Sequence, residues 1–120
     1  MNDAILHEII ENGLVIFSLI PKSKRPKSKG WSQFTIDESI CELEKGMFNG
    51  AGVSLLCGKQ NGICAIDIDN DKYLNTLPRS PVVKRGNKGE TRFFKYNGQP
   101  TKHYVDVDFL SDGSHTVMPP

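Results

Sequence analysis

The stretch CAIDIDND, residues 64–71, combines the composition of a buried strand with three acidic residues. Side chains of a strand alternate between its two faces, so Asp67 and Asp69 point the same way while the isoleucines beside them point into the core. Two carboxylates about 7 Å apart on one face repel each other unless a cation lies between them. Oxygen ligands at a strand end suit Mg²⁺ or Mn²⁺, which leave positions open for water and phosphate oxygens. For Asp71, past the strand, we expect the role of a turn or cap residue.

The same spacing recurs in YVDVDFL, which predicts Asp106 and Asp108 on a second apolar strand. Between the acidic strands lies KRGNKGETRFFKY, with cations that could meet phosphates: Lys84, Arg85, Lys88 and Arg92. Acidic strands next to basic ones suit metal-dependent phosphoryl or nucleotidyl transfer, because cations neutralise the charge that the transition state spreads over oxygens. The alternative interpretation of the acidic pair is a solvent-facing polar edge.

A basic segment, PKSKRPKSKGW, covers residues 21–31, and its two prolines and glycine exclude a regular helix. The whole chain has 15 basic and 14 acidic residues, so this concentration of positive charge is local. Phosphate binding and a solvated loop are equally good interpretations of such a run. We place nucleic-acid or phosphate binding at Lys22, Lys24, Arg25 and Lys29. We expect Trp31 to pack the loop down rather than to stack on a base.

The elements that must position these residues are two helices followed mostly by strands. Helical spacing of apolar residues predicts helices over residues 2–13, capped by Asn2 or Asp3, and 35–46, capped by Thr35 or Asp37. In the second helix Ile40 is among the residues expected to face inward. About seven strands are predicted. Residues 51–58 and 62–69 are two strands joined by the turn GKQNG, and 14–20 is another. Two strands each are expected within 80–96, around the Gly-rich turn 86–89, and within 103–120, around a turn at 111–113. Strands in runs favour an α+β fold, with a mixed or antiparallel sheet and helices packed on it.

The length of 120 residues predicts one domain, residues 1–120, with a modest core. A hydrophobic content of 38% is typical of a soluble globular domain.

Three cysteines without a CxxC motif predict reduced core thiols and a cytoplasmic protein. No apolar run approaches the ~20 residues that span a bilayer, so no membrane association is expected. The end at TVMPP, just after a strand-like run, predicts the N-terminal part of a longer protein.

In their order and spacing, several of these blocks resemble the bifunctional DNA primase/polymerase (prim-pol) domain of the archaeo-eukaryotic primase superfamily, found in phage, plasmid and mobile-element replication proteins. The blocks are GLVIFSLIPKSKRPKSKGW, FTIDESI, GAGVSLLCG, GICAIDIDND and VDFLSDGSHTVMPP. Each is weak alone, but together they cover essentially the whole chain. The resemblance implies an RRM-like α+β core. Domains of this family continue beyond the Pro-Pro pair, so the C-terminal part is expected to be missing here.

The resemblance also implies roles for particular residues. Asp67 and Asp69 match the first metal-binding motif, and Asp108 matches the remaining acidic ligand, with Asp106 in reserve. The second motif of the family is a Gly-rich turn leading to a histidine that contacts the incoming nucleotide. Arg92 stands about where that histidine is expected. Arginine can hold a triphosphate bidentately, and the other cations of this block, Lys84, Arg85 and Lys88, are implied as further nucleotide contacts.

The implied function is template-directed nucleotidyl transfer with Mg²⁺ or Mn²⁺, nucleoside triphosphates and a single-stranded DNA template, in a replication protein that could carry a helicase domain. One alternative is a degenerate, non-catalytic module that binds single-stranded DNA or a replication partner; Arg92 in place of histidine and the short C-terminus favour it. Another is a metal-dependent nuclease or phosphotransferase that uses the same carboxylates and needs no deoxynucleotides.

Overall fold

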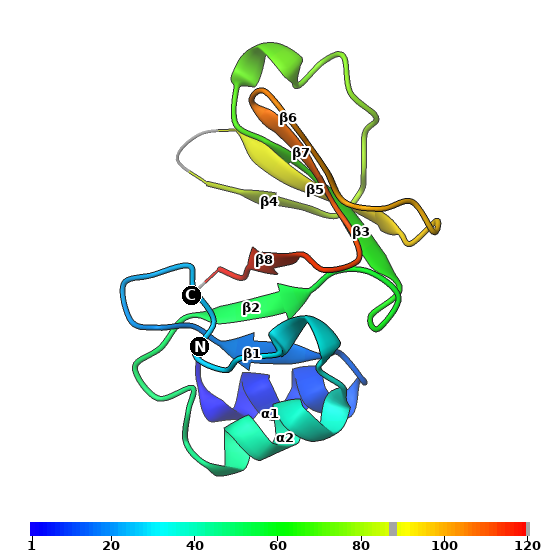
Figure 1. Ribbon diagram of the computed structural model, residues 1–120. Helices are drawn as coiled ribbons and strands as arrows, with labels where there is room; N and C mark the ends of the chain where they lie inside the picture. The colour runs from blue at the N-terminus through cyan, green and yellow to red at the C-terminus, as the bar shows by residue number, and fades with distance from the viewer. Residues whose placement is uncertain (87–88, 120) are drawn as a thin grey trace. The chain divides into compact units, whose positions relative to one another are not determined.

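The computed structural model describes residues 1–86 and 89–119, so the predicted nucleotide contact Lys88 lies outside the described residues. The chain forms two compact units. The first, here the helical unit, comprises Met1–Leu56 and the residues from His115 on; the second, the sheet unit, is Cys57–Ser114. The described residues form two α-helices and two antiparallel sheets, which confirms the α+β prediction (Figure 1). The assignment of residues 1–120 to one domain stays a prediction.

The helical unit places two helices beside a three-stranded sheet with the strand order β1-β2-β8. Its elements are α1 (Asp3–Glu11), β1 (Ile16–Ser18), a short 3-10 helix (Trp31–Gln33), α2 (Ile36–Glu44), β2 (Val53–Leu56) and β8 (His115–Val117). Both helices begin at predicted caps. The Asn2 side chain accepts from the backbone N–H of Ile5 at 3.0 Å, and Thr35 forms a capping box with Glu38. Neither helix in the described part is long and apolar enough to cross a membrane.

The inner side of α2 is more polar than its sequence pattern predicts. Ile40, expected to face inward, is 37% exposed, whereas Ser39 and Glu42 are buried. Ser39 Oγ accepts from the backbone N–H of Ile16 at 3.0 Å and donates to its carbonyl at 2.6 Å. Glu42 Oε1 accepts from the backbone N–H of Ser18 at 2.7 Å. Because β1 is an edge strand, its outward backbone groups need such partners when they are buried.

The core of the helical unit is built around Phe17. Val15, Leu19, Phe34 and Leu56 are buried with it. The Trp31 ring lies 5.5 Å from the Phe17 ring, centroid to centroid, and 4.8 Å from the His115 ring. Trp31 therefore packs the end of the basic segment onto this core, as predicted. The same burial lowers the pKa of His115.

The sheet unit is a five-stranded antiparallel sheet with the strand order β4-β5-β3-β7-β6, so β3 is central (Figure 1). Its elements are β3 (Ile63–Ile68), a short 3-10 helix (Asp71–Tyr73), β4 (Val83–Arg85), β5 (Glu90–Lys95), β6 (Lys102–Tyr104) and β7 (Val107–Leu110). The predicted pair of strands around the Gly-rich turn is confirmed, since β4 pairs with β5.

Two predicted strand neighbours belong to different sheets. β2 and β3, expected as neighbours across the GKQNG turn, lie in the three-stranded and five-stranded sheet respectively, and β7 and β8 are divided in the same way. The hairpin near the C-terminus is instead formed by β6 and β7, around a two-residue turn at Val105 and Asp106. Asp106, predicted on a strand, has a φ of 62° in that turn, a conformation that Asp tolerates better than most residues.

A glycine allows β5 to begin beside the end of β3. Gly89 has a φ of +61°, and a Cβ built on it would lie 1.6 Å from the carbonyl oxygen of Ile68. No other residue fits this position without moving β3. Gly89 also donates its N–H to Asp71 Oδ1 at 3.2 Å. Asp71, expected to be a turn or cap residue, is the first residue of the short 3-10 helix, and the capping side chain is that of Asn70.

Candidate active site

One row of polar side chains crosses the five-stranded sheet. Residues paired across an antiparallel ladder share a face. The register pairs Lys84 with Thr91, Thr91 with Asp67, Asp67 with Asp108, and Asp108 with His103. The five side chains therefore share one face, one from each strand, in the order of the strands. We call this the carboxylate face.

Three carboxylates gather at the middle of this face. Oxygen atoms of Asp67, Asp69 and Asp108 all lie within 4.8 Å of one another. Asp67 and Asp108 are partly buried, whereas Asp69 is exposed. Asp69 follows the last residue of β3, and its backbone N–H donates to the carbonyl of Asp106 at 2.8 Å, which fixes the end of the strand. The structure thus brings together the three acidic residues that the sequence singled out.

This donor set fits a hard divalent cation. Three negative charges this close repel one another unless a cation offsets them. Opposite ligands of an octahedral Mg²⁺ ion lie about 4.2 Å apart, because each Mg–O distance is about 2.1 Å. No pair of the three carboxylate oxygens is more than 4.8 Å apart, so small side-chain rotations would bring all three within reach of one ion. The exposure of Asp69 leaves one side of the cluster open to solvent, as Mg²⁺ and Mn²⁺ sites that retain water require.

Two residues that sequence reasoning missed contact the carboxylates directly. Thr91 Oγ1 donates to Asp67 Oδ1 at 3.0 Å, and His103 Nδ1 lies 2.8 Å from Asp108 Oδ1. An ionised carboxylate can only accept, so Nδ1 of His103 carries the proton in this contact. No local signal marks His103 in the sequence, because its pairing with Asp108 depends on a two-residue turn at residues 105 and 106 that lacks the usual turn residues.

Lys84 is the predicted nucleotide contact that shares this face. Beyond its place in the row, its charge acts on Cys57, which packs with Ala65, Leu110 and, at the edge of the cluster, Phe93. Burial and the neighbouring Cys64 raise the pKa of Cys57 to about 12, and Lys84 lowers it in part. The strand register thus places Lys84 on the same side of the sheet as Asp67.

Arg92, expected to hold a triphosphate, lies on the opposite face. It pairs with Ile66 in the register and is 5% exposed. Its Nε donates to Glu90 Oε2 at 3.1 Å, and its two terminal nitrogens donate to the carbonyls of Leu77, Pro78 and Leu74 at 3.0, 3.0 and 2.6 Å. The guanidinium thus holds the segment after β3 against the sheet, and four of its five N–H donors bind the protein itself.

Arg85 also belongs to this opposite face, because it pairs with Glu90 in the register. Its side chain is 76% exposed, with Nη2 3.9 Å from Glu90 Oε1. Neither arginine of the predicted nucleotide set therefore points toward the three carboxylates. The alternation of side chains along β4 and β5 divides that set, with Lys84 on one face and Arg85 and Arg92 on the other.

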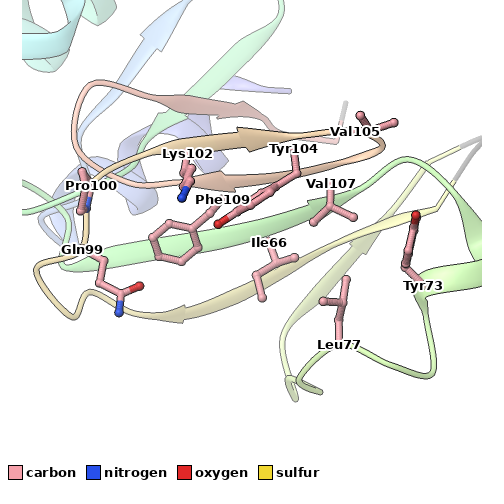
Figure 2. A pocket seen from close by; sticks show the side chains of 10 residues that line it. All are labelled: Ile66, Tyr73, Leu77, Gln99, Pro100, Lys102, Tyr104, Val105, Val107 and Phe109. Atoms are coloured by element: carbon pink, nitrogen blue, oxygen red, sulfur yellow. The ribbon is translucent and has the colours of Figure 1, made fainter.

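The opposite face carries an open apolar pocket of about 750 Å³. Figure 2 shows Ile66, Val107 and Phe109 on the strands, with Tyr73 and Leu77 contributed by the segment that follows β3. Lys102 and Tyr104 of β6 line its other side (Figure 2). We call this the apolar face.

Asp106, held in reserve as a metal ligand, is not part of the acidic cluster found among the described residues. Its Oδ2 accepts from Asn70 Nδ2 at 3.4 Å, and its carbonyl accepts from Asp69. Asp106 therefore joins the β6–β7 turn to the end of β3.

The basic segment belongs to the helical unit and is tied down by its backbone. Ile20 donates its N–H to the carbonyl of Arg25 at 2.8 Å, and Lys27 donates its N–H to the carbonyl of Ser18 at 3.0 Å. The Lys27 side chain is also bound, to the carbonyl of Met47 at 2.6 Å. The four predicted phosphate contacts are all exposed: Lys22, Lys24, Arg25 and Lys29.

Comparison with known proteins identifies the family of the chain. A sequence model of the family described as bifunctional DNA primase/polymerase, N-terminal, matches residues 6–120. No curated protein matches the chain. The match covers both sheets, the basic segment and the three clustered carboxylates. The chain therefore belongs to the family of bifunctional DNA primase/polymerase N-terminal domains.

Proposed function

We propose that this domain carries out metal-dependent, template-directed nucleotidyl transfer, with Mg²⁺ or Mn²⁺ bound by Asp67, Asp69 and Asp108. The observation that carries the proposal is the meeting of these three carboxylates on one face of the sheet, within 4.8 Å of one another. A bound ion would activate a primer 3′-hydroxyl and bridge the phosphates of the incoming nucleoside triphosphate.

In this proposal, different cations of the domain contact the phosphates of the nucleotide and those of the template. Lys84, on the carboxylate face, contacts the triphosphate, where it offsets charge that develops on the phosphate oxygens. The exposed residues of the basic segment contact the backbone of a single-stranded DNA template, a contact that carries no sequence information. We further propose that the domain acts in replication of a phage, plasmid or mobile element, together with a helicase domain or replication protein.

Metal titration tests the site before any synthesis is attempted. We expect the wild-type chain to bind Mn²⁺, and to bind it more tightly when a nucleoside triphosphate is present. The double variant Asp67→Asn/Asp69→Asn should lose this binding, since two of the three anionic ligands become neutral. Asp106→Asn is the matched control, because it removes a nearby carboxylate outside the cluster. A wild-type chain that binds no Mn²⁺ with or without nucleotide refutes the proposal.

Primer synthesis separates polymerase from nuclease chemistry. With single-stranded DNA, Mn²⁺ and deoxynucleotides, we expect extended products from the wild-type chain and none from the double variant. Metal-dependent shortening of DNA without deoxynucleotides would instead identify a nuclease that uses the same carboxylates.

A second candidate function is single-stranded DNA binding without chemistry. The exposure of Lys22, Lys24, Arg25 and Lys29 on an ordered loop favours it, because such a surface needs neither metal nor carboxylate. Replacing these four residues by glutamine would then abolish DNA binding, and Asp67→Asn/Asp69→Asn or a chelator would leave it unchanged. Binding that requires metal and the aspartates favours the first proposal.

A further inference from the structure

The two carboxylates that face each other across β3 and β7 each have one oxygen in a hydrogen bond to the next strand outward. On β5, Thr91 donates to Oδ1 of Asp67 at 3.0 Å. On β6, His103 Nδ1 contacts Oδ1 of Asp108 at 2.8 Å. Thr91 and His103 therefore flank the carboxylate pair from opposite sides of the row.

Such contacts matter for a metal ligand because a carboxylate rotates easily. The terminal torsion of an aspartate is broad and roughly two-fold, so an isolated carboxylate samples many orientations. A hydrogen bond to one oxygen removes much of that freedom and leaves the second oxygen for another contact. His103 is 70% exposed, so packing does not explain its place beside Asp108.

We propose that Thr91 and His103 are positioning residues of the metal site. Each holds one oxygen of its aspartate, so that Asp67 and Asp108 present their second oxygens to one cation from fixed directions. Partners of this kind around metal ligands raise metal affinity by about 10–100-fold. The inference rests on the metal site of the proposed function and adds the two residues that orient its ligands.

Mn²⁺ titration of the 120-residue chain, followed by the paramagnetic resonance signal of free Mn²⁺, tests the inference without any activity assay. Thr91→Val and His103→Ala should each weaken Mn²⁺ binding by about 10–100-fold. Thr91→Ser keeps the hydroxyl, and His103→Asn keeps a donor near the position of Nδ1. Both conservative variants should therefore retain affinity within about threefold of wild type. His7→Ala, which removes an exposed histidine of α1, is the control and should bind as wild type does.

Each other outcome overturns a distinct part of the inference. Wild-type affinity in both Thr91→Val and His103→Ala refutes the positioning roles, and the metal site itself still stands if Asp67→Asn/Asp69→Asn abolishes binding. Equal losses in His103→Asn and His103→Ala refute positioning by a hydrogen bond from His103, because a donor retained near the position of Nδ1 would then not restore affinity. A wild-type chain that binds no Mn²⁺ refutes the proposed metal site and this inference together. Circular dichroism melting of each variant separates lost affinity from lost folding.

Discussion

The two faces of the five-stranded sheet carry their charges in opposite ways. On the apolar face, Arg92 is buried next to Glu90, and its guanidinium donates to a carboxylate and three carbonyls. On the carboxylate face, Asp67, Asp69 and Asp108 crowd three like charges together. A charge with matched partners is characteristic of structure, whereas crowded like charges indicate a site that a ligand completes. Position in the sheet, rather than residue type, thus separates the charges with partners in the protein from those proposed to bind a ligand.

The largest loss of stability is expected from removing the buried guanidinium of Arg92. Arg92→Met leaves Glu90 buried without its partner and three carbonyls without a donor. Removal of one partner from a buried pair typically costs about 3–5 kcal/mol, so the free energy of unfolding should fall by that amount in urea denaturation. Arg85→Met, which removes the exposed neighbour of the same Glu90, should cost less than about 1 kcal/mol. Similar small losses for both variants would contradict a structural role for Arg92.

A loss of stability nearly as large is expected from substitution of Gly89, where β5 begins beside the end of β3. Gly89→Ala adds left-handed strain of about 1–2 kcal/mol and an overpacking cost of about 1–3 kcal/mol against the carbonyl of Ile68. Thermal and urea unfolding should show the sum. Gly98→Ala is the matched control, because Gly98 also has a positive φ but nothing lies within 4 Å of its added Cβ. Equal destabilisation by the two variants would show that backbone strain alone matters.

On the carboxylate face, a substitution is expected to raise the free energy of unfolding, by a smaller amount. Asp67→Asn removes one of two like charges that are paired across β3 and β7, and its oxygen still accepts from Thr91. Without metal, the variant should be more stable than wild type by about 0.2–1 kcal/mol. In Mn²⁺ at 100 times its Kd, the wild type should gain about 2.7 kcal/mol and the order should reverse. Unfolding in chelator and in Mn²⁺ measures both values, and an unchanged order in Mn²⁺ would contradict metal binding by Asp67.

The smallest effect is expected at Cys57, a buried thiol that packs against Ala65 and Leu110. Burial raises the pKa of Cys57 to about 12, so its thiol stays protonated, and therefore unreactive, where exposed thiols ionise. Iodoacetamide at pH 8 should label the exposed Cys41 and spare Cys57 in the native chain, as peptide mass spectrometry would show. Denaturation is the control, since all three cysteines should then react. Native labelling of Cys57 at the rate of Cys41 would contradict its burial.

The raised pKa of Cys57 also predicts how the free energy of unfolding changes with pH. The raised pKa of Cys57 means that the folded state holds its proton more tightly than the unfolded state does. This contribution is complete below the unfolded pKa of about 8.5–9 and is lost as pH rises from there toward 12. Cys57→Ala should therefore show a smaller alkaline loss of stability than wild type.

The parts of the site that sequence predicted are those that depend on local alternation. Asp67 and Asp69 share a side because side chains along an extended chain alternate, whatever the neighbouring strands do. Arg92 could not be placed in this way, because its face depends on the register between β5 and β3, and a shift of one residue reverses every side chain. Thr91, one position earlier, occupies the face for which Arg92 was predicted.

Other differences arise where the fold overrides a sequence signal. The turn at Val105 and Asp106 lacks the Asn-Gly type of pair that marks short hairpins, so β6 and β7 were predicted as one strand and His103 was overlooked. In α2, the apolar spacing predicts Ile40 inside, but the edge of β1 requires polar partners and receives Ser39 and Glu42 instead. Capping residues, by contrast, act within one helical turn, and Asn2 and Thr35 were predicted correctly.

The polar inner side of α2 also has a consequence for how copies of this chain behave together. An edge strand with unpaired N–H and carbonyl groups is a template on which another molecule can add a strand. In β1, both outward groups of Ile16 are bonded to Ser39, the N–H of Ser18 is bonded to Glu42, and its carbonyl is bonded to Lys27. An incoming strand would find each of these four groups already taken. Ser39 and Glu42 thereby protect this edge of the helical unit against strand-by-strand aggregation.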